Sequence, residues 1–453
     1  MNVHEAVQRQ REFFASNSTK DVKKRKELLR KLYRVMQEYE EGMLEALEKD
    51  LNKSRMEAYV TEISQAYHEA KLMLRNIDKW SKPKSASRSL LMPFSKNCMY
   101  YEPYGVTLII APWNYPVNLS LLPMIGALAA GNTVLLKPSE FSVNISKVIE
   151  HMINDNFPAE YLHVLPLDTA PAEMWNERYD FIFFTGSPRI GKLVMAEAAR
   201  NLTPVTLELG GKSPCVVDRK ANLKMAARRI VWGKLMNAGQ TCIAPDYLLV
   251  HADVKDELIS LIQQEISSRY PDALHNASYP HIIDDRQFNR LTKLIATESN
   301  IIGGKSDAAT RCIEPTLFPD CNWESEIMQE ELFGPLLPVL SYTDLSEIIT
   351  AIKSHERPLA CYVFTEDHKV AERIINEVSF GGGCVNDCLM QISNPSIPFG
   401  GVGNSGMGQY HGKYSFQTFS RIKSVVKSPT WFDITVRLAP FTDSKFKFFK
   451  RWM

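Results

Sequence analysis

The chain has 453 residues, too many for one ordinary hydrophobic core, so we expect two or three domains. With 45% hydrophobic and 23% charged residues, its composition is typical of a soluble globular protein. The 53 lysines and arginines balance the 52 aspartates and glutamates, so no excess of charge favours nucleic acid or a membrane surface as a partner.

Targeting signals and cysteine spacing bear on the location of the protein. Residues 1–20 lack an apolar stretch followed by a cleavage site, and no apolar run is long enough to span a bilayer. The eight cysteines include no CxxC pair, and Cys384 and Cys388 have no histidine ligands nearby. This pattern predicts a cytoplasmic protein with reduced thiols, no disulfide framework and no metal.

The N-terminal part of the chain has the spacing of amphipathic helices. Apolar residues recur at intervals of three and four over residues 20–50, and the same pattern continues over residues 57–80. Residues 81–87, Ser-Lys-Pro-Lys-Ser-Ala-Ser, are typical of a connector, and residues 99–102 suit a short edge strand.

From Tyr104 the pattern changes to strands that alternate with helices. Such alternation predicts parallel sheets covered by helices on both faces, with a domain boundary near residues 210–212. The first set comprises strands 106–110, 133–136, 181–184 and 205–209 and helices 119–130, 142–154 and 191–200, the first of these helices being ended by Gly131. The second set comprises strands 214–217 and 247–251 and helices 223–235 and 255–268.

Two short segments carry the chemistry. Cys242 ends the run Asn237-Ala-Gly-Gln-Thr-Cys242, whose small and polar residues suit close approach of backbone amides to a ligand. Glu208 ends an apolar strand and is followed by Gly210 and Gly211. A thiol that attacks a carbonyl and a carboxylate that activates water are the parts needed for covalent aldehyde oxidation. The alternatives are an inert buried cysteine and a strand-end carboxylate facing water.

Two further turns suit a dinucleotide. Thr185-Gly-Ser-Pro-Arg-Ile-Gly191 follows a strand and opens a helix, whose N-terminal amides attract phosphate. Its glycine spacing is not that of the usual dinucleotide fingerprint, and Pro188 removes one backbone donor. Lys137-Pro-Ser-Glu140 follows another strand, where both charged side chains could reach ribose hydroxyls. An ordinary solvated loop is the alternative.

Together these segments resemble the aldehyde dehydrogenase superfamily over almost the full chain. The matching segments, in order, are Ala111-Pro-Trp-Asn-Tyr-Pro116, Lys137-Pro-Ser-Glu140, Phe184-Thr-Gly-Ser187, Leu207-Glu-Leu-Gly-Gly-Lys-Ser213, Gly239-Gln-Thr-Cys242, Glu331-Leu-Phe-Gly-Pro335 and Pro398-Phe-Gly-Gly401. The short N-terminus and residues 404–420 are similar to the class 3 branch, which includes the fatty-aldehyde enzymes. That branch implies a homodimer and the use of either NAD or NADP.

The resemblance also implies roles for individual residues. Cys242 would be the nucleophile, Glu208 the general base and Asn114 an oxyanion donor beside the Cys242 amide. The cofactor would be held by residues of three matched segments together with Gly191 of the turn 185–191: Lys137, Glu140, Gly186, Ser187, Gly191, Glu331 and Phe333. An apolar aldehyde tunnel would be lined by Tyr115, Leu119, Trp232 and Met236, with His411 near its rim. Trp232 and Met236 are four apart on one predicted helix, so plain core packing is the alternative for both.

The expected fold is therefore α/β and aldehyde dehydrogenase-like, with two doubly wound parallel-sheet domains and a small β arm. Residues 1–82 and 104–210 would form the dinucleotide-binding domain and residues 211–403 the catalytic domain. Residues 83–103 and 421–442 would form the oligomerisation arm, and residues 443–453 a basic amphipathic tail.

The expected function is NAD(P)-dependent oxidation of medium- or long-chain aliphatic, or aromatic, aldehydes to carboxylic acids, through a thiohemiacetal and a thioester. A CoA-acylating aldehyde dehydrogenase and a catalytically silent binding protein on the same fold are the alternatives. For the tail, the sequence allows weak membrane contact, a lid over the tunnel, or docking on its own dimer. The physiological aldehyde, the cofactor preference and the pathway do not follow from the sequence.

Overall fold

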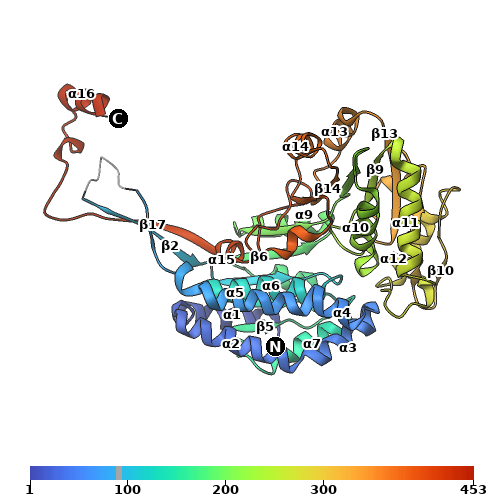
Figure 1. The fold of residues 1–453 in the computed structure, drawn as a ribbon. Helices are drawn as coiled ribbons and strands as arrows, with labels where there is room; N and C mark the ends of the chain where they lie inside the picture. Colours follow the sequence, from blue (N-terminus) through green and yellow to red (C-terminus); the bar gives the residue numbers. More distant parts are fainter. Residues whose placement is uncertain (88–93, 453) are drawn as a thin grey trace.

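Two parallel sheets and one antiparallel arm make up the chain, in a computed structural model that describes residues 1–87 and 94–452 (Figure 1). The first sheet has the strand order β16-β7-β6-β3-β4-β5, and all its pairs are parallel except β16 with β7. Its strands are β3 (Val106–Ile110), β4 (Thr133–Lys137), β5 (Leu162–Val164), β6 (Phe181–Gly186), β7 (Val205–Leu209) and β16 (Gly406–Met407).

Helices cover both faces of this sheet because successive side chains of a buried strand point to opposite sides. Leu108 packs in a cluster with α1 (Val3–Ala15), α8 (Pro171–Trp175) and α9 (Pro188–Ala199). Its neighbour Ile109 packs in another cluster, on the side of the longer N-terminal helices. These are α2 (Val22–Glu38), α3 (Glu40–Leu51), α4 (Arg55–Ala58), α5 (Ser64–Trp80), α6 (Pro116–Ala130) and α7 (Val143–Asn154), with a π-helical turn η2 (Tyr59–Ile63) between α4 and α5.

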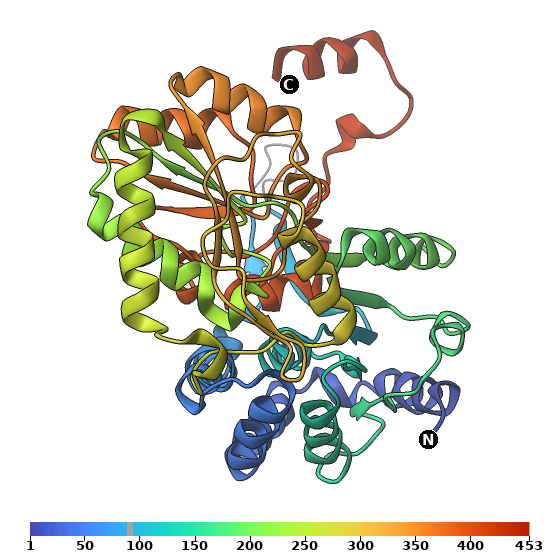
Figure 2. The ribbon, with the colours of Figure 1, turned by 90° about the vertical axis from the view of Figure 1, so that its right-hand side faces the viewer.

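The second sheet is parallel throughout, with the order β12-β13-β9-β8-β14-β15. Its strands are β8 (Pro214–Val217), β9 (Tyr247–His251), β12 (Thr316–Phe318), β13 (Leu336–Tyr342), β14 (Ala360–Phe364) and β15 (Gly382–Val385). Its helices are α10 (Leu223–Leu235), α11 (Lys255–Arg269), α12 (Asp285–Ile295), α13 (Leu345–Ser354) and α14 (His368–Glu377). Figure 2 shows this body above the N-terminal helices.

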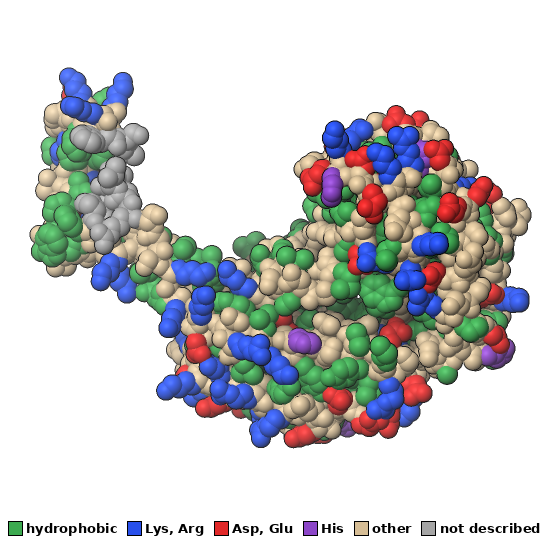
Figure 3. Space-filling view, viewed as in Figure 1, with side chains coloured by type: hydrophobic (Ala, Val, Ile, Leu, Met, Phe, Trp, Pro, Cys, Tyr) green, Lys and Arg blue, Asp and Glu red, His purple; other side chains and the backbone are tan. Residues whose placement is uncertain are grey.

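The arm is built from β1 (Lys84–Ser85), β2 (Lys96–Pro103) and β17 (Ser420–Lys427), all antiparallel. It extends away from both sheets and leads to a terminal helix, α16 (Asp443–Trp452), that stands clear of the body (Figures 1 and 3). The remaining short elements are a hairpin of β10 (Ser306–Asp307) and β11 (Cys312–Ile313), and helix α15 (Lys413–Thr418).

The predicted fold class is confirmed, and several details of the prediction are wrong. The expected edge strand over residues 99–102 is the middle strand β2 and spans 8 residues, because β1 and β17 pair with it on both sides. The expected connector contains β1. Helix α1, strand β5 and helix α8 were not predicted. Parts of the predicted arm and tail, residues 88–93 and 453, lie outside the described residues.

Residues 404–420, for which no domain was predicted, belong with the first sheet. Strand β16 pairs with β7, and Phe416 of α15 packs in the same cluster as Ile109. The predicted domain boundaries themselves stay predictions. Within the described ranges, no helix is both long and apolar enough to cross a membrane.

Candidate active site

The segment that carries Cys242 is a strained turn between α10 and β9. Helix α10 ends at Leu235, and Asn237, Ala238 and Gly239 then adopt left-handed backbone angles, with φ of 53°, 50° and 76°. A Cβ on Gly239 would lie 2.2 Å from the Gly334 carbonyl oxygen, so only glycine fits there. The glycine therefore lets this turn pack directly on the Gly334 backbone, while the approach of its amides to a ligand stays a prediction.

Cys242 itself is half-buried, and its thiol has no disulfide partner. Burial raises the pKa of the thiol well above its ordinary value, and the charges of Glu331 and Glu208 raise it further. The thiol is therefore protonated at neutral pH in the unliganded chain. A reaction that uses the thiolate needs a base or a change of surroundings when ligands bind.

Glu208 lies on β7, opposite Thr185 of β6 and Gly406 of β16. Its residue is 2% exposed, and neither carboxyl oxygen has a hydrogen-bond partner among the described residues. Burial raises the pKa of this carboxyl well above its ordinary value. The alternative of a strand-end carboxylate facing water is wrong, because β16 covers the edge of β7.

Asn114 comes from the first-sheet part of the chain and contacts the cysteine loop. It lies in the turn between β3 and α6, and its Nδ2 donates to the Gln240 carbonyl at 3.0 Å. The next residue, Tyr115, places its hydroxyl 2.7 Å from the Thr241 Oγ1. The structure thus brings Asn114, Tyr115 and the segment ending at Cys242 together, as the sequence predicted.

Lys137 and Glu140 lie at the carboxyl end of β4, where ligands of parallel sheets bind. The Lys137 Nζ is 3.7 Å from a Glu140 carboxyl oxygen and donates to the carbonyls of Pro138 and Leu167, at 3.0 and 3.1 Å. The Lys137 side chain is nearly buried, whereas that of Glu140 is 62% exposed. An exposed carboxylate beside a fixed cation is free to meet a ribose.

The turn from β6 into α9 is a capped helix start. Ser187 is the N-cap, its Oγ accepts from the Ile190 amide at 3.4 Å, and Pro188 is the first helical residue. Proline at that position breaks no intrahelical bond, which explains why it is tolerated, although it leaves one amide fewer for a ligand. A Cβ on Gly191 would lie 2.6 Å from Leu209 Cδ2, so this glycine lets α9 pack closely on β7.

Glu331 reaches the site from the second-sheet side. Its carboxylate accepts from the Gly211 amide, and a Cβ on Gly210 would lie 2.1 Å from it. Burial and the nearby Asp246 raise the pKa of this carboxyl to about 8. Phe333, with a φ of 51°, packs its ring edge-to-face on Trp113 at 5.4 Å. The predicted cofactor segment therefore lies against the turns that hold Glu208 and Asn114.

Comparison with known proteins identifies this arrangement. The model of the aldehyde dehydrogenase family matches residues 1–425. The chain belongs to the aldehyde dehydrogenase family. It is accordingly an oxidoreductase that acts on aldehyde groups.

The relatives confirm the similarity to class 3. The chain is 46% identical over 442 residues to 4,4'-diaponeurosporen-aldehyde dehydrogenase of Staphylococcus aureus, covering 97% of this chain and 96% of the relative. It is 40% identical over 432 residues to the dimeric NADP-preferring aldehyde dehydrogenase of Canis lupus familiaris, covering 94% and 95%. A solved structure of Staphylococcus aureus AldH in a substrate-bound state superposes with a TM-score of 0.97 at 45% identity, covering all of both chains.

The predicted substrate residues of the dehydrogenase differ in their surroundings. Tyr115 is buried, Leu119 is half-buried, and Trp232 on α10 is 38% exposed. Met236 lies beyond the end of α10 with a ψ of 128°, so the prediction that it shares a helix face with Trp232 is wrong. The left-handed turn before Cys242 ends α10 at Leu235, one residue before Met236.

His411 is half-buried and neutral. Its ring stacks on Phe399 at 5.3 Å, and burial lowers its pKa to about 4. The preceding Tyr410 is fully buried and close enough to Glu208 and Cys242 for both to raise the pKa of its hydroxyl. The segment around His411 thus reaches the catalytic cluster through Tyr410, which the sequence did not single out.

The sequence analysis also missed the charges that hold the Glu331 segment. Lys212 pairs with Asp246 and donates to the Glu330 carbonyl at 2.9 Å. The other Asp246 oxygen accepts from the Leu332 amide at 2.9 Å. Lys234 is buried nearby, and burial lowers its pKa to about 8. The one available signal was the position of Lys212 and Asp246 directly after the Glu208 and Cys242 segments.

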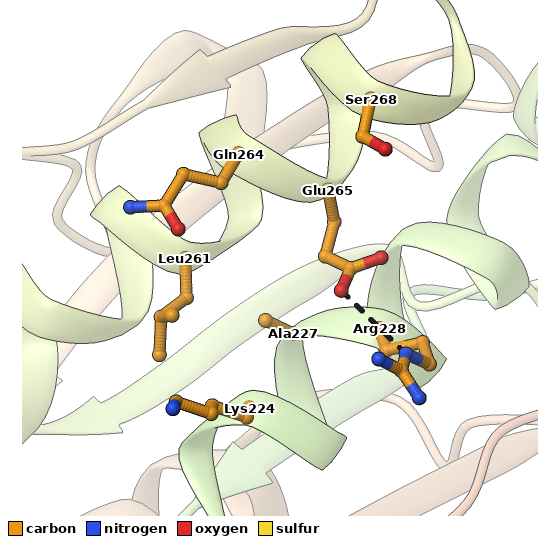
Figure 4. A pocket seen from close by; sticks show the side chains of 7 residues that line it. All are labelled: Lys224, Ala227, Arg228, Leu261, Gln264, Glu265 and Ser268. Carbon is orange, nitrogen blue, oxygen red and sulfur yellow. Dashed lines mark ion pairs between the residues drawn. The ribbon is translucent and has the colours of Figure 1, made fainter.

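A shallow hollow lies elsewhere, between α10 and α11 (Figure 4). It is lined by Lys224, Arg228 and Glu265, among others, and Glu265 is already paired with Arg228 and Arg269. None of the predicted site residues lines it. Over the described part of the chain, no group of three or more histidine, cysteine, aspartate or glutamate residues is placed to hold a metal ion.

Proposed function

We propose that this dehydrogenase oxidises medium- or long-chain aliphatic, or aromatic, aldehydes to carboxylic acids with NAD or NADP. The observation that carries the proposal is the convergence of the Cys242 thiol, the Glu208 carboxyl and the Asn114 amide from two sheets. A nucleophile, a general base and an oxyanion donor are what covalent oxidation followed by hydrolysis requires.

The residues around the first sheet suit a dinucleotide. Lys137 and Glu140 lie at a strand end, Gly186 and Ser187 at a helix N-terminus, and Glu331 lies against the Gly210 turn. Of these, Lys137 and Glu140 would hold the adenosine ribose, and the start of α9, closely packed through Gly191, would face the phosphates. Glu331 and Phe333 would hold the nicotinamide end, where the bound cofactor accepts a hydride from the substrate carbon.

The chain's own groups carry the other steps. The Cys242 thiol loses its proton, and its sulfur adds to the aldehyde carbon to give a thiohemiacetal. The Asn114 Nδ2 and the Cys242 amide donate to the oxyanion, a kind of contact worth ~3–4 kcal/mol in the transition state. After oxidation to the thioester, Glu208 takes a proton from water, the hydroxide adds to the acyl carbon, and the carbon–sulfur bond breaks to release the acid.

The substrate side rests on the apolar and aromatic residues near Cys242. Tyr115, Leu119, Trp232 and Met236 would line the aldehyde path, with His411 near its rim. A neutral histidine stacked on Phe399 keeps that region free of charge, which favours an apolar aldehyde. The staphylococcal relative is named for 4,4'-diaponeurosporen-aldehyde, which makes that compound one to include in an assay panel.

Assembly, domain roles and location complete the proposal. The arm at residues 83–103 and 421–442 would join two copies into a homodimer, the state named for the canine relative. Residues 1–82 and 104–210 would bind the dinucleotide and residues 211–403 would carry the catalytic cysteine. The eight cysteines form no disulfide, which supports a reducing cytoplasm.

The test is NAD(P)H formation from a panel that runs from hexanal to long-chain and aromatic aldehydes, with NAD and NADP in parallel. Turnover should require Cys242, so Cys242→Ala should lose activity while still binding cofactor. Product analysis with and without CoA separates hydrolysis from the CoA-acylating alternative, against which the buried Glu208 argues. No turnover with any aldehyde would favour the silent binding protein.

A further inference from the structure

A buried ion pair lies directly beneath the Asn114 turn. Lys53, between α3 and α4, and Glu62, in η2, are both 0% exposed, and the Lys53 Nζ is 2.6 Å from Glu62 Oε1. A lysine ammonium is costly to bury unless it is paired and its N–H groups are satisfied. The hydrogen bonds that Lys53 and Glu62 make to other residues therefore show which part of the chain the pair holds in place.

The ammonium of Lys53 contacts both residues of the turn. It donates to the Asn114 carbonyl at 2.9 Å and lies 4.0 Å from the centre of the Tyr115 ring. Together with the hydrogen bond to Glu62, these contacts give each of the three N–H groups of the ammonium a partner.

Glu62 holds the other side of the same turn. Its second oxygen accepts from the amides of Val117 and Asn118, at 2.8 and 3.4 Å. These amides belong to the first turn of α6, where helix donors have no intrahelical partner and the helix dipole favours an anion. Lys53 and Glu62 thus bracket residues 114–118 from both ends.

This clamp fixes the direction of the Asn114 side chain. The Asn114 carbonyl also accepts from Asn237 Nδ2 at 2.8 Å, so two donors hold its peptide plane. One N–H of the Asn114 amide is bound to the Gln240 carbonyl. The second N–H makes no hydrogen bond among the described residues and is available to an oxyanion next to Cys242.

We propose that Lys53 and Glu62 are positioning residues that aim the Asn114 amide at the oxyanion formed on Cys242. The inference rests on the proposed role of Asn114. Both residues are fully buried, so they act on the reaction through the residues they contact, which are Asn114, Tyr115 and the start of α6.

The first experiment replaces Lys53 by methionine, which keeps the length of the side chain and removes the ammonium. We expect kcat for hexanal to fall about tenfold, because small misplacements of a positioned group cost one to two orders of magnitude. The dissociation constant for NAD or NADP should stay within about twofold, since the cofactor residues are untouched.

Arg25→Met is the matched control. Arg25, on α2, is also a buried cation that contacts α6, but it binds the opposite end of α6: it donates to the Ala129 carbonyl at 3.3 Å, and it also donates to the Thr19 carbonyl at 2.6 Å. Arg25→Met should lower the melting temperature about as much as Lys53→Met does, and it should leave kcat near the parent value. An equal loss of kcat in both variants would show a general packing effect and overturn the proposal.

The decisive measurement is a double-mutant cycle with Asn114→Ala. If Lys53 acts through Asn114, adding Lys53→Met to Asn114→Ala should change kcat by less than about twofold. Multiplicative losses would overturn the proposal. Glu62→Gln is a second variant in case Lys53→Met does not fold: its one carbonyl oxygen cannot accept from both the Lys53 ammonium and the Val117 N–H, so it should reproduce the loss and the non-additivity.

The outcomes also separate this inference from the proposed function. If the parent enzyme oxidises no aldehyde, or Asn114→Ala keeps full activity, the proposed function or the role of Asn114 has failed. If the parent is active, Asn114→Ala is impaired, and Lys53→Met behaves like Arg25→Met, only the positioning role has failed.

Discussion

The two side chains proposed to react, Glu208 and Cys242, are acids whose pKa values are both raised by burial. Burial raises the pKa of Glu208 and of Cys242, and each group in its charged form disfavours ionisation of the other. At most one of them is therefore expected to be charged at a time. This suits an order of reaction steps in which the thiolate is needed first. The carboxylate is needed later, after the sulfur has become part of a neutral thioester.

Replacing Glu208 by glutamine should stall the enzyme after oxidation. The amide keeps the shape of the side chain but cannot take a proton from water, so thioester hydrolysis should slow by at least ~10²-fold. Rapid-mixing measurements should show a burst of NAD(P)H equal to the concentration of sites, followed by a slow steady state. Loss of the burst itself would mean that Glu208 acts earlier, for example on the Cys242 proton.

The same variant should change stability in a pH-dependent way. A carboxyl whose pKa is raised by folding binds more protons in the folded than in the unfolded chain, so it costs stability as the pH rises above its ordinary value of 4.5. Glu208→Gln removes this cost, so its stability relative to the parent should increase with pH, by up to ~1.4 kcal/mol per pH unit.

Denaturant unfolding of both proteins at pH 5, 6.5 and 8 measures this difference. Cys242→Ala at the same pH values is the control for loss of a neighbouring side chain. A difference that is constant across the three pH values would mean that Glu208 is ionised in the folded protein.

At the scale of elements, the turn after α10 determines where the cysteine lies. Gly239→Ala places a Cβ at a φ of 76° and 2.2 Å from a backbone oxygen, so the turn must shift. We expect a loss of stability of ~1–3 kcal/mol and a larger fractional loss of activity, because Cys242 is three residues away.

Gly42→Ala is the matched control for that substitution. Gly42 lies inside α3, and its added Cβ would be 3.9 Å from the nearest side-chain atom. There alanine should stabilise the chain by up to ~1 kcal/mol and leave activity unchanged. Thermal unfolding and hexanal turnover of the two variants test both expectations, and equal behaviour would contradict the assignment of strain to the turn.

The elements that sequence predicted well are those whose pattern is local. Apolar runs such as residues 106–110 and 181–184 are buried on both faces and show no alternation, and glycine or proline residues bound them. Strand β5 was missed because it has only 3 residues, and β2 was mistaken for an edge because its partner β17 lies more than 300 residues later in the chain. Pairing over that distance leaves no local signal.

Site residues were predictable where they lie in the matched segments and not where tertiary structure buries them. Cys242, Glu208 and Asn114 stand in runs of unusual composition. Lys53 and Glu62 instead look like charges on the solvated side of helical segments, and only the approach of α6 makes them a buried pair. Met236 was misplaced because it was treated as part of the helix predicted over residues 223–235, although it lies one residue past the end of that helix and has extended backbone.

At the scale of the whole molecule, the arm and tail are the parts that a single chain leaves uncovered. Trp431 is 73% exposed, Phe441 83% and Phe446 67%, and α16 stands away from the body of its own chain (Figures 1 and 3). Exposed aromatic residues in such numbers are typical of a surface that binds something else. For the tail, the sequence left open a membrane, a substrate tunnel and a second copy.

Deleting residues 443–453 tests the role of the tail. Helix α16 carries Lys445, Lys447, Lys450 and Arg451 beside its phenylalanines, and it stands clear of both sheets in Figure 1. Because the proposed catalytic residues Cys242, Glu208 and Asn114 lie outside the arm and tail, turnover of hexanal should stay within about twofold of the full chain. Long-chain aldehydes should show an altered KM if α16 covers a tunnel entrance, with the truncated protein still dimeric by light scattering.

If α16 instead binds anionic membrane, the full chain should sediment with anionic vesicles, reversibly and less at high salt, and the truncated chain should not. Replacing only Lys445 and Lys447 by glutamine is the matched control, because it removes charge and keeps the aromatic residues. It should abolish vesicle binding but leave long-chain kinetics unchanged. If the truncated enzyme and the full chain show the same long-chain kinetics and the same vesicle binding, the tail serves only to pack within the dimer.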